Sequence, residues 1–433
     1  MQLTVDQILA LSPDESSRKS GRDLAQPGKW VSKGMDGKAL WGECQGSGSK
    51  PYQTQIDLSQ LAFKCSCPSR KFPCKHGIGL MLFCASRPGD FQSSAQPAWV
   101  ADWLNKRAEK KEKKEDISIK PVDEEAKAKR VQARELKVAD GVDELLKWMK
   151  DLVRKGILSI PEKGPAYFET MARRMIDAQA PGLAASLRNL GEINFYQEGW
   201  HTEFMEQLLQ IYLLAKAYQH LDVQTATLQS DVKAWIGFTQ NQEELREKPG
   251  LVDVWMVLAK QSSERDGITT ERFWLYGTES RQYALLMQFI VRGQGVQYSL
   301  SPGMCLQAEL VFYPSQTPLR ALIKQQHQLE KTVKPIGYQS WKEVSDEDST
   351  MSALNPFRFE RPFIVHGLTP VYWQNLWWLQ DRQKALVKIS NQTTKILTLV
   401  SISGGMPMDM VVIGREETYE VVGIWLNERY TAI

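Results

Sequence analysis

One short cluster of cysteine and histidine residues constrains this chain more than any other feature. Within twelve positions the sequence contains Cys65-Ser-Cys67, then six residues, then Cys74-Lys-His76. Structural zinc prefers four sulfur or nitrogen ligands in a tetrahedron, and three thiolates and an imidazole supply them. Because four protein ligands leave no open position, the pattern predicts one structural Zn²⁺ rather than a catalytic one. The alternative is a chance cluster of buried cysteines.

Cysteine usage also indicates the compartment. The chain has 433 residues but only six cysteines. A sparse, clustered set is typical of a metal site in a reducing environment rather than of a disulfide framework. The first residues lack a cationic start followed by an apolar stretch, so we expect a cytoplasmic protein without a secretory signal. We expect Cys44, Cys84 and Cys305 to be small core residues rather than further ligands.

The residues around the cluster predict a hairpin followed by a helix. Ala39–Cys44 and Tyr52–Leu58 have strand character, and Gly46–Ser49 between them is a turn signal. The same glycine-rich segment would also suit an anion, although a turn is the simpler interpretation. Gly77–Phe83 is typical of a short buried helix, with His76 in its first turn. The local order is therefore strand, strand, metal ligands, helix.

The Cys-x-Cys and Cys-x-His pairs resemble the pattern of the SWIM zinc finger. Two further runs, Trp41–Tyr52 and Ala172–Ala184, are similar to bacterial SWIM zinc-finger proteins. The resemblance implies a ββα zinc module that binds DNA or protein. It also implies AAA+ ATPases and von Willebrand A-domain proteins as candidate partners, because similar proteins are often encoded beside them. Some SWIM proteins carry helicase motors, but this sequence has no Gly-x-x-x-x-Gly-Lys-Ser/Thr loop.

Charge gives only mild support for nucleic-acid binding. The formal net charge of +3 is too small for the whole chain to wrap nucleic acid, so any such surface must be local. Four cations flank the ligands, namely Lys64, Arg70, Lys71 and Lys75. They either offset the net negative charge of a zinc ion held by three thiolates or contact phosphates. In the second case we expect weak, salt-sensitive binding.

Changes of pattern along the chain predict an α+β multidomain protein. We expect an N-terminal region at 1–105 with the zinc finger at about 39–85, a charged linker at 106–138, a helical domain at 139–245 and a β-rich α+β domain at 246–433. Val5–Leu11 indicates a helix, and a polar stretch follows it up to Gly28. The charged segment is either a solvated helix or linker, or a basic arm that contacts phosphates.

Apolar residues in the middle of the chain repeat at three and four positions, as in helices that bury one face. The residues predicted to form this core are Leu145, Leu146, Met149, Leu152, Val153, Phe168, Met171, Ala172, Met175, Ile176, Leu183, Leu187, Leu190, Phe204, Leu208, Leu209, Tyr212, Leu213 and Ala215.

The last part of the chain favours an antiparallel sheet, because strand candidates follow one another. These candidates are Val252–Leu258, Arg272–Tyr276, Tyr283–Val291, Ala308–Tyr313, Ile396–Val400, Met410–Ile413 and Tyr419–Trp425. Between them we predict a helix at Val371–Gln380, with Trp373, Leu376 and Trp377 on one face that belongs to the core or to a partner groove. The acidic Asp346–Asp348 is expected to lie in a solvated loop.

No pattern in the sequence supports an enzyme. His201, His220, His327 and His366 have no partner at the spacing of a metal ligand or a catalytic triad. We therefore expect a non-enzymatic zinc-binding protein whose finger mediates nucleic-acid or protein binding. The alternative is a scaffold or adaptor of an ATPase-containing assembly that makes no DNA contact. We predict no membrane partner, because no apolar run approaches the roughly 20 residues of a membrane span.

Overall fold

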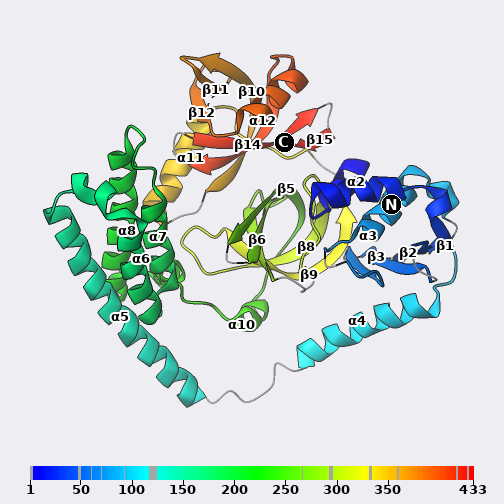
Figure 1. Ribbon diagram of the computed structural model, residues 1–433, viewed down its shortest axis with the longest axis horizontal. Coiled ribbons are helices and arrows are strands. Elements are labelled where there is room, and N and C mark those ends of the chain that lie inside the picture. Colours follow the sequence, from blue (N-terminus) through cyan, green and yellow to red (C-terminus); the bar gives the residue numbers. More distant parts are fainter. Residues whose placement is uncertain are drawn as a thin grey trace.

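The computed structural model places the chain in lobes around a central β-barrel (Figure 1). It describes residues 3–46, 50–59, 61–69, 71–91, 93–116, 124–265, 267–291, 296–330, 334–357, 360–415, 418–426 and 429–433. The N-terminal module lies on one side of the barrel and a helical bundle on the other, while a second sheet covers a third side. This confirms the predicted α+β class, with a helical middle and a β-rich end.

The N-terminal module is a four-stranded antiparallel sheet with helices packed against it. Its elements are α1 (Val5–Ala10), α2 (Glu15–Leu24), β1 (Trp30–Met35), β2 (Ala39–Cys44), β3 (Tyr52–Asp57), β4 (Ala62–Cys65) and α3 (Lys75–Ser86). The strand order is β1-β2-β3-β4. The predicted hairpin is confirmed, because β2 and β3 pair from Ala39 opposite Asp57 to Cys44 opposite Tyr52. Of the predicted turn at Gly46–Ser49, residues 47–49 lie outside the described residues.

The polar stretch before Gly28 contains helix α2, which the polar composition did not indicate. Asp14 caps this helix by accepting a 2.7 Å hydrogen bond from the backbone N–H of Ser17. Gly21 lets α2 approach α3 closely, since a Cβ at Gly21 would lie 2.7 Å from Cγ2 of Ile78. Helix formation here therefore depends on a cap and on tertiary packing rather than on an apolar stripe.

Helices make up the middle of the chain. They are α4 (Ala98–Asp116), α5 (Glu124–Arg154), α6 (Ile160–Asp177), α7 (Pro181–Glu192), α8 (Trp200–Gln219), α9 (Ala226–Ile236) and α10 (Gln242–Arg246). Short 3-10 helices occur at η1 (Pro27–Lys29), η2 (Pro88–Asp90), η3 (Ile157–Ser159) and η4 (Leu221–Val223). The charged segment falls at the end of α4 and the start of α5, and its residues 117–123 lie outside the described part. In Figure 1, α4 extends from the N-terminal module below the barrel, and α5 runs along the outer side of the bundle.

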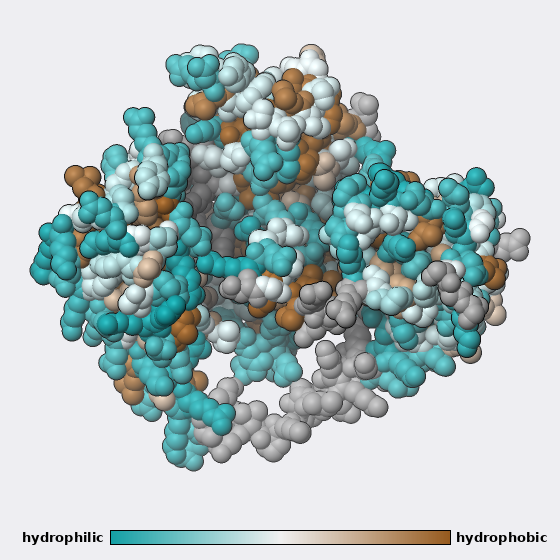
Figure 2. All heavy atoms as spheres, viewed as in Figure 1, coloured by the Kyte–Doolittle hydropathy of each residue, from teal (hydrophilic) through white to brown (hydrophobic). Residues whose placement is uncertain are grey.

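The bundle has its own core, formed by most of the predicted stripe. Val153, Ile176, Leu209 and Leu213 are exposed instead, so the prediction of burial was wrong for these four residues. They lie at the margins of the apolar stripes, where neighbouring helices no longer cover them. In Figure 2 the visible surface of this lobe is mostly hydrophilic.

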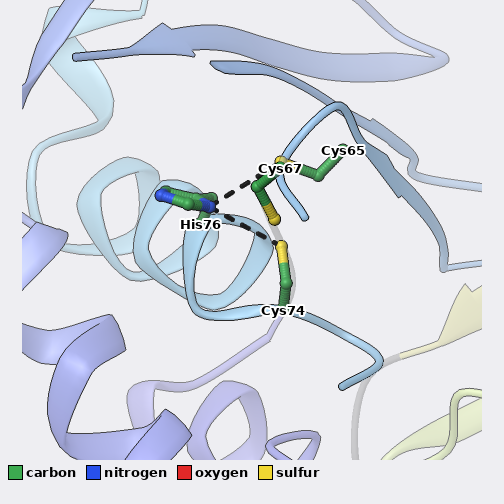
Figure 3. A group of neighbouring side chains, drawn as sticks. All are labelled: Cys65, Cys67, Cys74 and His76. Carbon is green, nitrogen blue, oxygen red and sulfur yellow. Dashed lines mark hydrogen bonds between the residues drawn. The ribbon is translucent and has the colours of Figure 1, made fainter. Parts of the chain in front are cut away.

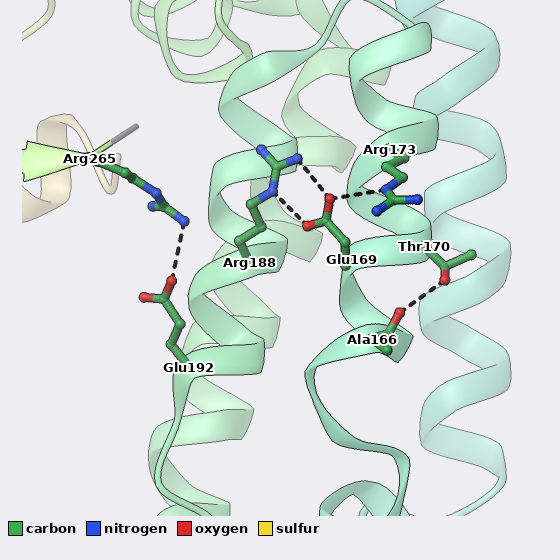
Figure 4. A network of polar contacts seen from close by, with 7 residues as sticks. All are labelled: Ala166, Glu169, Thr170, Arg173, Arg188, Glu192 and Arg265. Atoms are coloured by element: carbon green, nitrogen blue, oxygen red, sulfur yellow. Dashed lines mark hydrogen bonds and ion pairs between the residues drawn. The ribbon is translucent and has the colours of Figure 1, made fainter. Parts of the chain in front are cut away.

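An ion cluster joins two helices of the bundle (Figure 4). The carboxylate of Glu169 on α6 accepts hydrogen bonds of 2.8 and 3.1 Å from Arg188 on α7. Arg173 donates a third bond of 3.3 Å to the same carboxylate. Beside this cluster, Arg265 at the end of β5 forms a 3.2 Å ion pair with Glu192 and so links the barrel to the bundle.

The central barrel is closed and has five strands. They are β5 (Leu251–Arg265), β6 (Ile268–Gly277), β7 (Tyr283–Val291), β8 (Cys305–Phe312) and β9 (Arg320–Glu330), in the order β5-β6-β7-β9-β8. Neighbouring strands are antiparallel except β7 and β9, which are parallel.

The C-terminal lobe is a six-stranded sheet with two helices. Its elements are α11 (Trp341–Leu354), β10 (Arg361–Trp373), β11 (Leu376–Gln380), β12 (Leu386–Ile389), α12 (Thr393–Ser403), β13 (Met408–Arg415), β14 (Thr418–Leu426) and β15 (Arg429–Ala432). The order is β12-β11-β10-β13-β14-β15, with an additional parallel pairing of β12 and β14. No helix among the described residues has the length and hydrophobicity of a membrane span.

The predicted helix at Val371–Gln380 was wrong, because this segment is the β10–β11 hairpin. Gln374 and Asn375 form its turn with φ values of 49° and 61°, which reverses the chain at once. The aromatic residues then pair across the two strands, with Trp373 and Trp378 ring centroids 6.0 Å apart. Spacing that suits one helix face suits a hairpin equally well when a two-residue turn lies in the middle.

Two further predictions in this lobe were wrong. Ile396–Val400 is not a strand but part of α12, which buries Ile396 and Leu399 and exposes Leu397. Burial at every third residue is the helical period, which so short an apolar run could not reveal. Asp346–Asp348 lies in α11 rather than in a loop, because Ser340 caps this helix through the N–H of Glu343.

The finger and the barrel share one hydrophobic core. Residues from α1, α3 and the N-terminal sheet pack in one cluster with the barrel interior, including Leu306 and Leu310. A second cluster joins the outer face of the barrel to the C-terminal sheet through residues such as Trp274 and Val411. The N-terminal module is therefore a structural part of the barrel lobe.

Candidate metal centre

The four predicted ligands converge at the junction of β4 and α3. Cys65 ends β4, Cys67 lies in the following loop, Cys74 is the N-cap of α3, and His76 is in its first turn. One ligand atom from each residue lies within 4.8 Å of all the others (Figure 3). A strand end and a helix start thus present two donors each to one point.

The backbone fixes both halves of this arrangement. β4 pairs with β3 in a register that sets Cys65 opposite Thr54, and the N–H of Ser66 donates a 2.9 Å bond to the carbonyl of Gln53. Cys74 has extended dihedral angles, with φ −75° and ψ 166°, immediately before the helix begins. Because the chain changes direction there, Cys74 and His76 both face the sulfur atoms that follow β4.

Distances within the cluster fit a small tetrahedral ion. Nδ1 of His76 lies 3.7 Å from Sγ of Cys65 and 3.9 Å from Sγ of Cys74. With Zn–S of about 2.3 Å and Zn–N of about 2.0 Å, ligand atoms of a tetrahedral site lie roughly 3.6 Å apart. The buried hydroxyl of Thr54 is a further polar partner, with Oγ1 3.2 Å from Sγ of Cys65.

Mutual hydrogen bonds shift the proton affinities of the ligands. Hydrogen bonds from Cys65 and Cys74 hold the pKa of the Cys67 thiol far below its usual value. The pKa of Cys74 is raised, because it donates to the Cys65 and Cys67 sulfurs and is largely buried. Burial alone would lower the pKa of His76, but hydrogen bonds with Cys65 and Cys67 raise it to about 9. Metal binding requires these thiols to be deprotonated and the imidazole to be neutral, so it releases protons from the cluster.

The four predicted cations around the ligands do not behave alike. Lys64 and Lys75 are exposed. Lys71 forms a 2.7 Å ion pair with Asp14, the cap of α2, and this contact lowers the pKa of that carboxyl. Arg70 lies outside the described residues.

The other cysteines and histidines are not part of this cluster. Cys44, Cys84 and Cys305 are buried, as predicted for core residues. Burial raises the pKa of Cys44 and Cys84. His366 has a partner that the sequence did not indicate, since its Nδ1 lies 3.1 Å from a carboxylate oxygen of Asp409. That contact joins β10 to β13, two strands that lie far apart in the sequence, so it becomes evident only from their pairing.

Thr54 is the residue of the centre that sequence reasoning missed. Its place next to Cys65 follows from the register of β3 and β4, and β4 was not predicted. The period-two pattern of Tyr52–Leu58 was the one signal that bears on it, because it places Thr54 on the same strand face as Tyr52 and Ile56.

Fold and site together define a zinc-finger protein with a structural metal centre. The family model of the SWIM zinc finger matches residues 52–85, and that of the SWIM-associated four-helix bundle domain matches residues 133–236. The chain therefore contains a SWIM zinc finger followed by a SWIM-associated four-helix bundle domain, and its Cys₃His cluster is the site of a structural zinc ion. The second match covers most of α5 and all of α6 to α9. No curated protein and no solved structure matches the chain significantly.

Proposed function

We propose that this protein is a non-enzymatic binding protein whose finger contacts nucleic acid. Two exposed lysines beside the metal ligands carry the proposal. Lys64 precedes Cys65 on β4, and Lys75 is the first residue of α3. Within the described residues neither lysine forms an ion pair, so both charges are available to phosphates.

The remaining cations limit how strong such a contact is. Lys71 is already paired with Asp14, which neutralises part of its charge. Arg70, outside the described residues, stays a proposed contact because of its sequence position. A surface with so few free cations neutralises few phosphates, so its binding is weak and falls with salt.

Duplex binding by the Lys64→Ala/Lys75→Ala variant tests the proposal. Each phosphate contact contributes about −0.9 to the slope of log K against log salt on B-form DNA. Removing two lysines should therefore flatten the slope by about 2 units. Lys147→Ala/Lys150→Ala, on the exposed side of α5, is the matched control and should leave the slope unchanged. Equal affinity and slope in the finger variant and the wild type would exclude the finger as the DNA surface.

The C-terminal lobe favours a second candidate function, that of a protein scaffold. Tyr372 and Trp373 are exposed at the tip of the β10–β11 hairpin. Tyrosine and tryptophan are enriched among the residues that dominate protein interfaces. In this alternative the chain docks an ATPase-containing assembly of AAA+ or von Willebrand A-domain proteins and makes no DNA contact.

Co-purification distinguishes the two functions. If the scaffold function holds, a reconstituted AAA+ or von Willebrand A-domain partner should be lost from Trp373→Ala and retained by Lys64→Ala/Lys75→Ala. Because Trp373 accepts a hydrogen bond from Trp378 through its backbone carbonyl, the truncation keeps that contact. Retention by both variants would contradict docking at the hairpin.

The proposal also places the protein in the cytoplasm of a bacterium. Its cysteines are all unpaired. Thiolate ligands of this kind persist where glutathione or thioredoxin keeps cysteines reduced. Fractionation of the source cell, followed by detection with an antibody, tests the location directly.

A further inference from the structure

The connectivity of the barrel bears on a second binding site. Counted within the barrel, the strands follow the order first, second, third, fifth, fourth, and the third and fifth are parallel neighbours. This is the Greek-key connectivity of the OB-fold. OB-folds bind oligonucleotides or oligosaccharides on the face of their second and third strands and with the loop that joins the fourth to the fifth. In this chain those parts are β6, β7 and residues 313–319.

Part of this outer face is covered by the C-terminal sheet. Trp274 and Tyr276 on β6 and Leu285 on β7 point outward and pack in the cluster that joins the barrel to that sheet. Further along β7 the cover ends. Phe289 is 56% exposed, although it is a large aromatic residue on a barrel strand. Phe289 lies on the uncovered part of the face and lines a cleft together with residues of the helical bundle.

A cleft of about 610 Å³ begins at Phe289 and lies between the barrel and the bundle. Residues of α7 and α9 and the segment after α9 line one side of it. The segment between β8 and β9 lines the other. Asn355, Phe357 and Arg361 of the C-terminal part also line it. The aromatic lining residues are Trp235, Phe238, Phe289, Tyr313 and Phe357.

The charged lining residues favour an anion. They are Arg320, Arg361 and Asp231, so positive charge exceeds negative. The guanidinium carbon of Arg320 lies 4.7 Å from the ring centroid of Tyr313. Asp231 accepts a 2.8 Å hydrogen bond from the N–H of Gln316, which holds the β8–β9 segment against α9. Arg361 is buried and already engaged, so Arg320 is the partly exposed cation of the cleft.

We propose that this cleft binds single-stranded nucleic acid, with a base stacked on Phe289 or Tyr313 and a phosphate at Arg320. Aromatic platforms next to cations bind single strands with little sequence preference, because every base offers a flat face. The excess of positive charge favours a nucleic acid over a neutral oligosaccharide. The bundle that lines one side of this cleft lies across the barrel from the N-terminal module (Figure 1). The cleft proposal does not depend on the finger's proposed role.

Fluorescence anisotropy of a labelled oligothymidylate of about 12 nucleotides tests the site, because one OB-fold covers about 4 to 16 nucleotides. The full-length, zinc-loaded protein is used throughout. Phe289→Ala should weaken binding by about 5- to 150-fold, the effect of losing one base stack. Phe289→Trp should retain binding. Tyr196→Ala removes another aromatic ring, one that is 99% exposed in the segment after α7, and should change nothing.

Arg320→Gln gives an independent readout. It should reduce the slope of log K against log salt by about 0.7, the contribution of one phosphate of a single strand. Unfolding midpoints of all variants are recorded first. If Phe289→Ala is destabilised, Phe289→Leu replaces it, because leucine keeps an apolar side chain but offers no aromatic face. Affinities within about two-fold of the wild type for both Phe289→Ala and Arg320→Gln would overturn the proposal.

Two further outcomes separate this site from the finger and from smaller ligands. If the oligonucleotide is lost only in Lys64→Ala/Lys75→Ala, the cleft proposal fails and the finger proposal stands. If it is lost only in the cleft variants, the cleft proposal stands and the finger makes no contact with single strands. Thymidine monophosphate that competes as tightly as the oligonucleotide would identify a free nucleotide as the occupant and overturn the single-strand assignment.

Discussion

A single hydroxyl supports the zinc ligands from the neighbouring strand. Thr54 is fully buried, and its Oγ1 lies 3.2 Å from Sγ of Cys65. A hydroxyl that donates to a thiolate stabilises the negative charge of the sulfur and fixes its direction. The metal centre therefore includes a residue outside the cysteine motif, and the strand register alone brings it there.

Replacing a ligand should remove the metal. In Cys67→Ser we expect zinc content well below one ion per chain and loss of structure in the finger, because metal binding contributes folding free energy. Elemental analysis of the purified protein measures the first effect and circular dichroism the second. Cys305→Ala, in a barrel strand, is the control and should keep one ion. A Cys67→Ser protein with stoichiometric zinc would show that the ligand set is wrong.

Removing the supporting hydroxyl should weaken the site without abolishing it. Thr54→Val keeps the shape of the side chain and deletes the donor to Cys65. Loss of such an outer partner reduces metal affinity by about 10- to 100-fold. Competition with a chromophoric chelator measures the affinity, and Thr54→Ser should preserve it. Identical affinities for Thr54→Val and the wild type would contradict a supporting role.

Paired helices of the bundle depend on charge as well as on apolar packing. Glu169 on α6 accepts two hydrogen bonds from Arg188 on α7 and one from Arg173. Hydrogen bonds from Arg188 lower the pKa of Glu169 to about 2. A two-pronged contact of this kind sets the relative position of the helices better than a single ion pair does.

The lowered pKa of Glu169 predicts how this contact responds to acid. A carboxylate with a depressed folded-state pKa stabilises the fold above its unfolded value of about 4.5 and loses that effect as pH falls towards 2. The difference in unfolding midpoint between the wild type and Glu169→Gln should therefore be largest above pH 5 and shrink between about pH 4.5 and 2. Thermal unfolding across this range measures it. A difference that is independent of pH would mean that the ion cluster does not contribute.

The finger, the barrel and the helical bundle are coupled to different extents. The finger and the interior of the barrel form one hydrophobic cluster, whereas the bundle buries a separate one. Polar contacts such as the Arg265–Glu192 ion pair and the Gln316–Asp231 hydrogen bond join the barrel to the bundle. The effect of zinc should thus extend into the barrel more than into the bundle.

Hydrogen exchange with and without a chelator tests this coupling. Removing zinc should increase amide exchange in the finger, in α1 and in the barrel strands that share its core. Exchange in α7 and α8 should stay unchanged, which makes the bundle an internal control. An increase confined to residues 52–85 would show that the finger opens independently of the barrel.

Local patterns predicted the metal ligands and many strands, because ligand spacing and strand alternation are properties of neighbouring residues. Local patterns could not predict the closure of the barrel, because closure depends on the pairing of β5 with β8 and of β7 with β9. Short apolar runs were ambiguous for a similar reason. The segment 371–380 is a hairpin because Gln374 and Asn375 have positive φ. The segment 396–400 belongs to a helix that ends at a left-handed cap, Gly404. Likewise, only the fold of α2 shows that Lys71 is paired.

The shared core has a consequence for how the chain is made. The finger's half of that core ends at Phe91, and the barrel's half begins at Trp255. The ribosome therefore releases the complementary surface about 160 residues after the finger, which corresponds to a delay of roughly 10 to 30 s at typical synthesis rates. During that interval the nascent finger contains all four metal ligands, but the barrel does not yet cover its apolar side. Early loading with zinc would hold the emerging segment together until the barrel is complete.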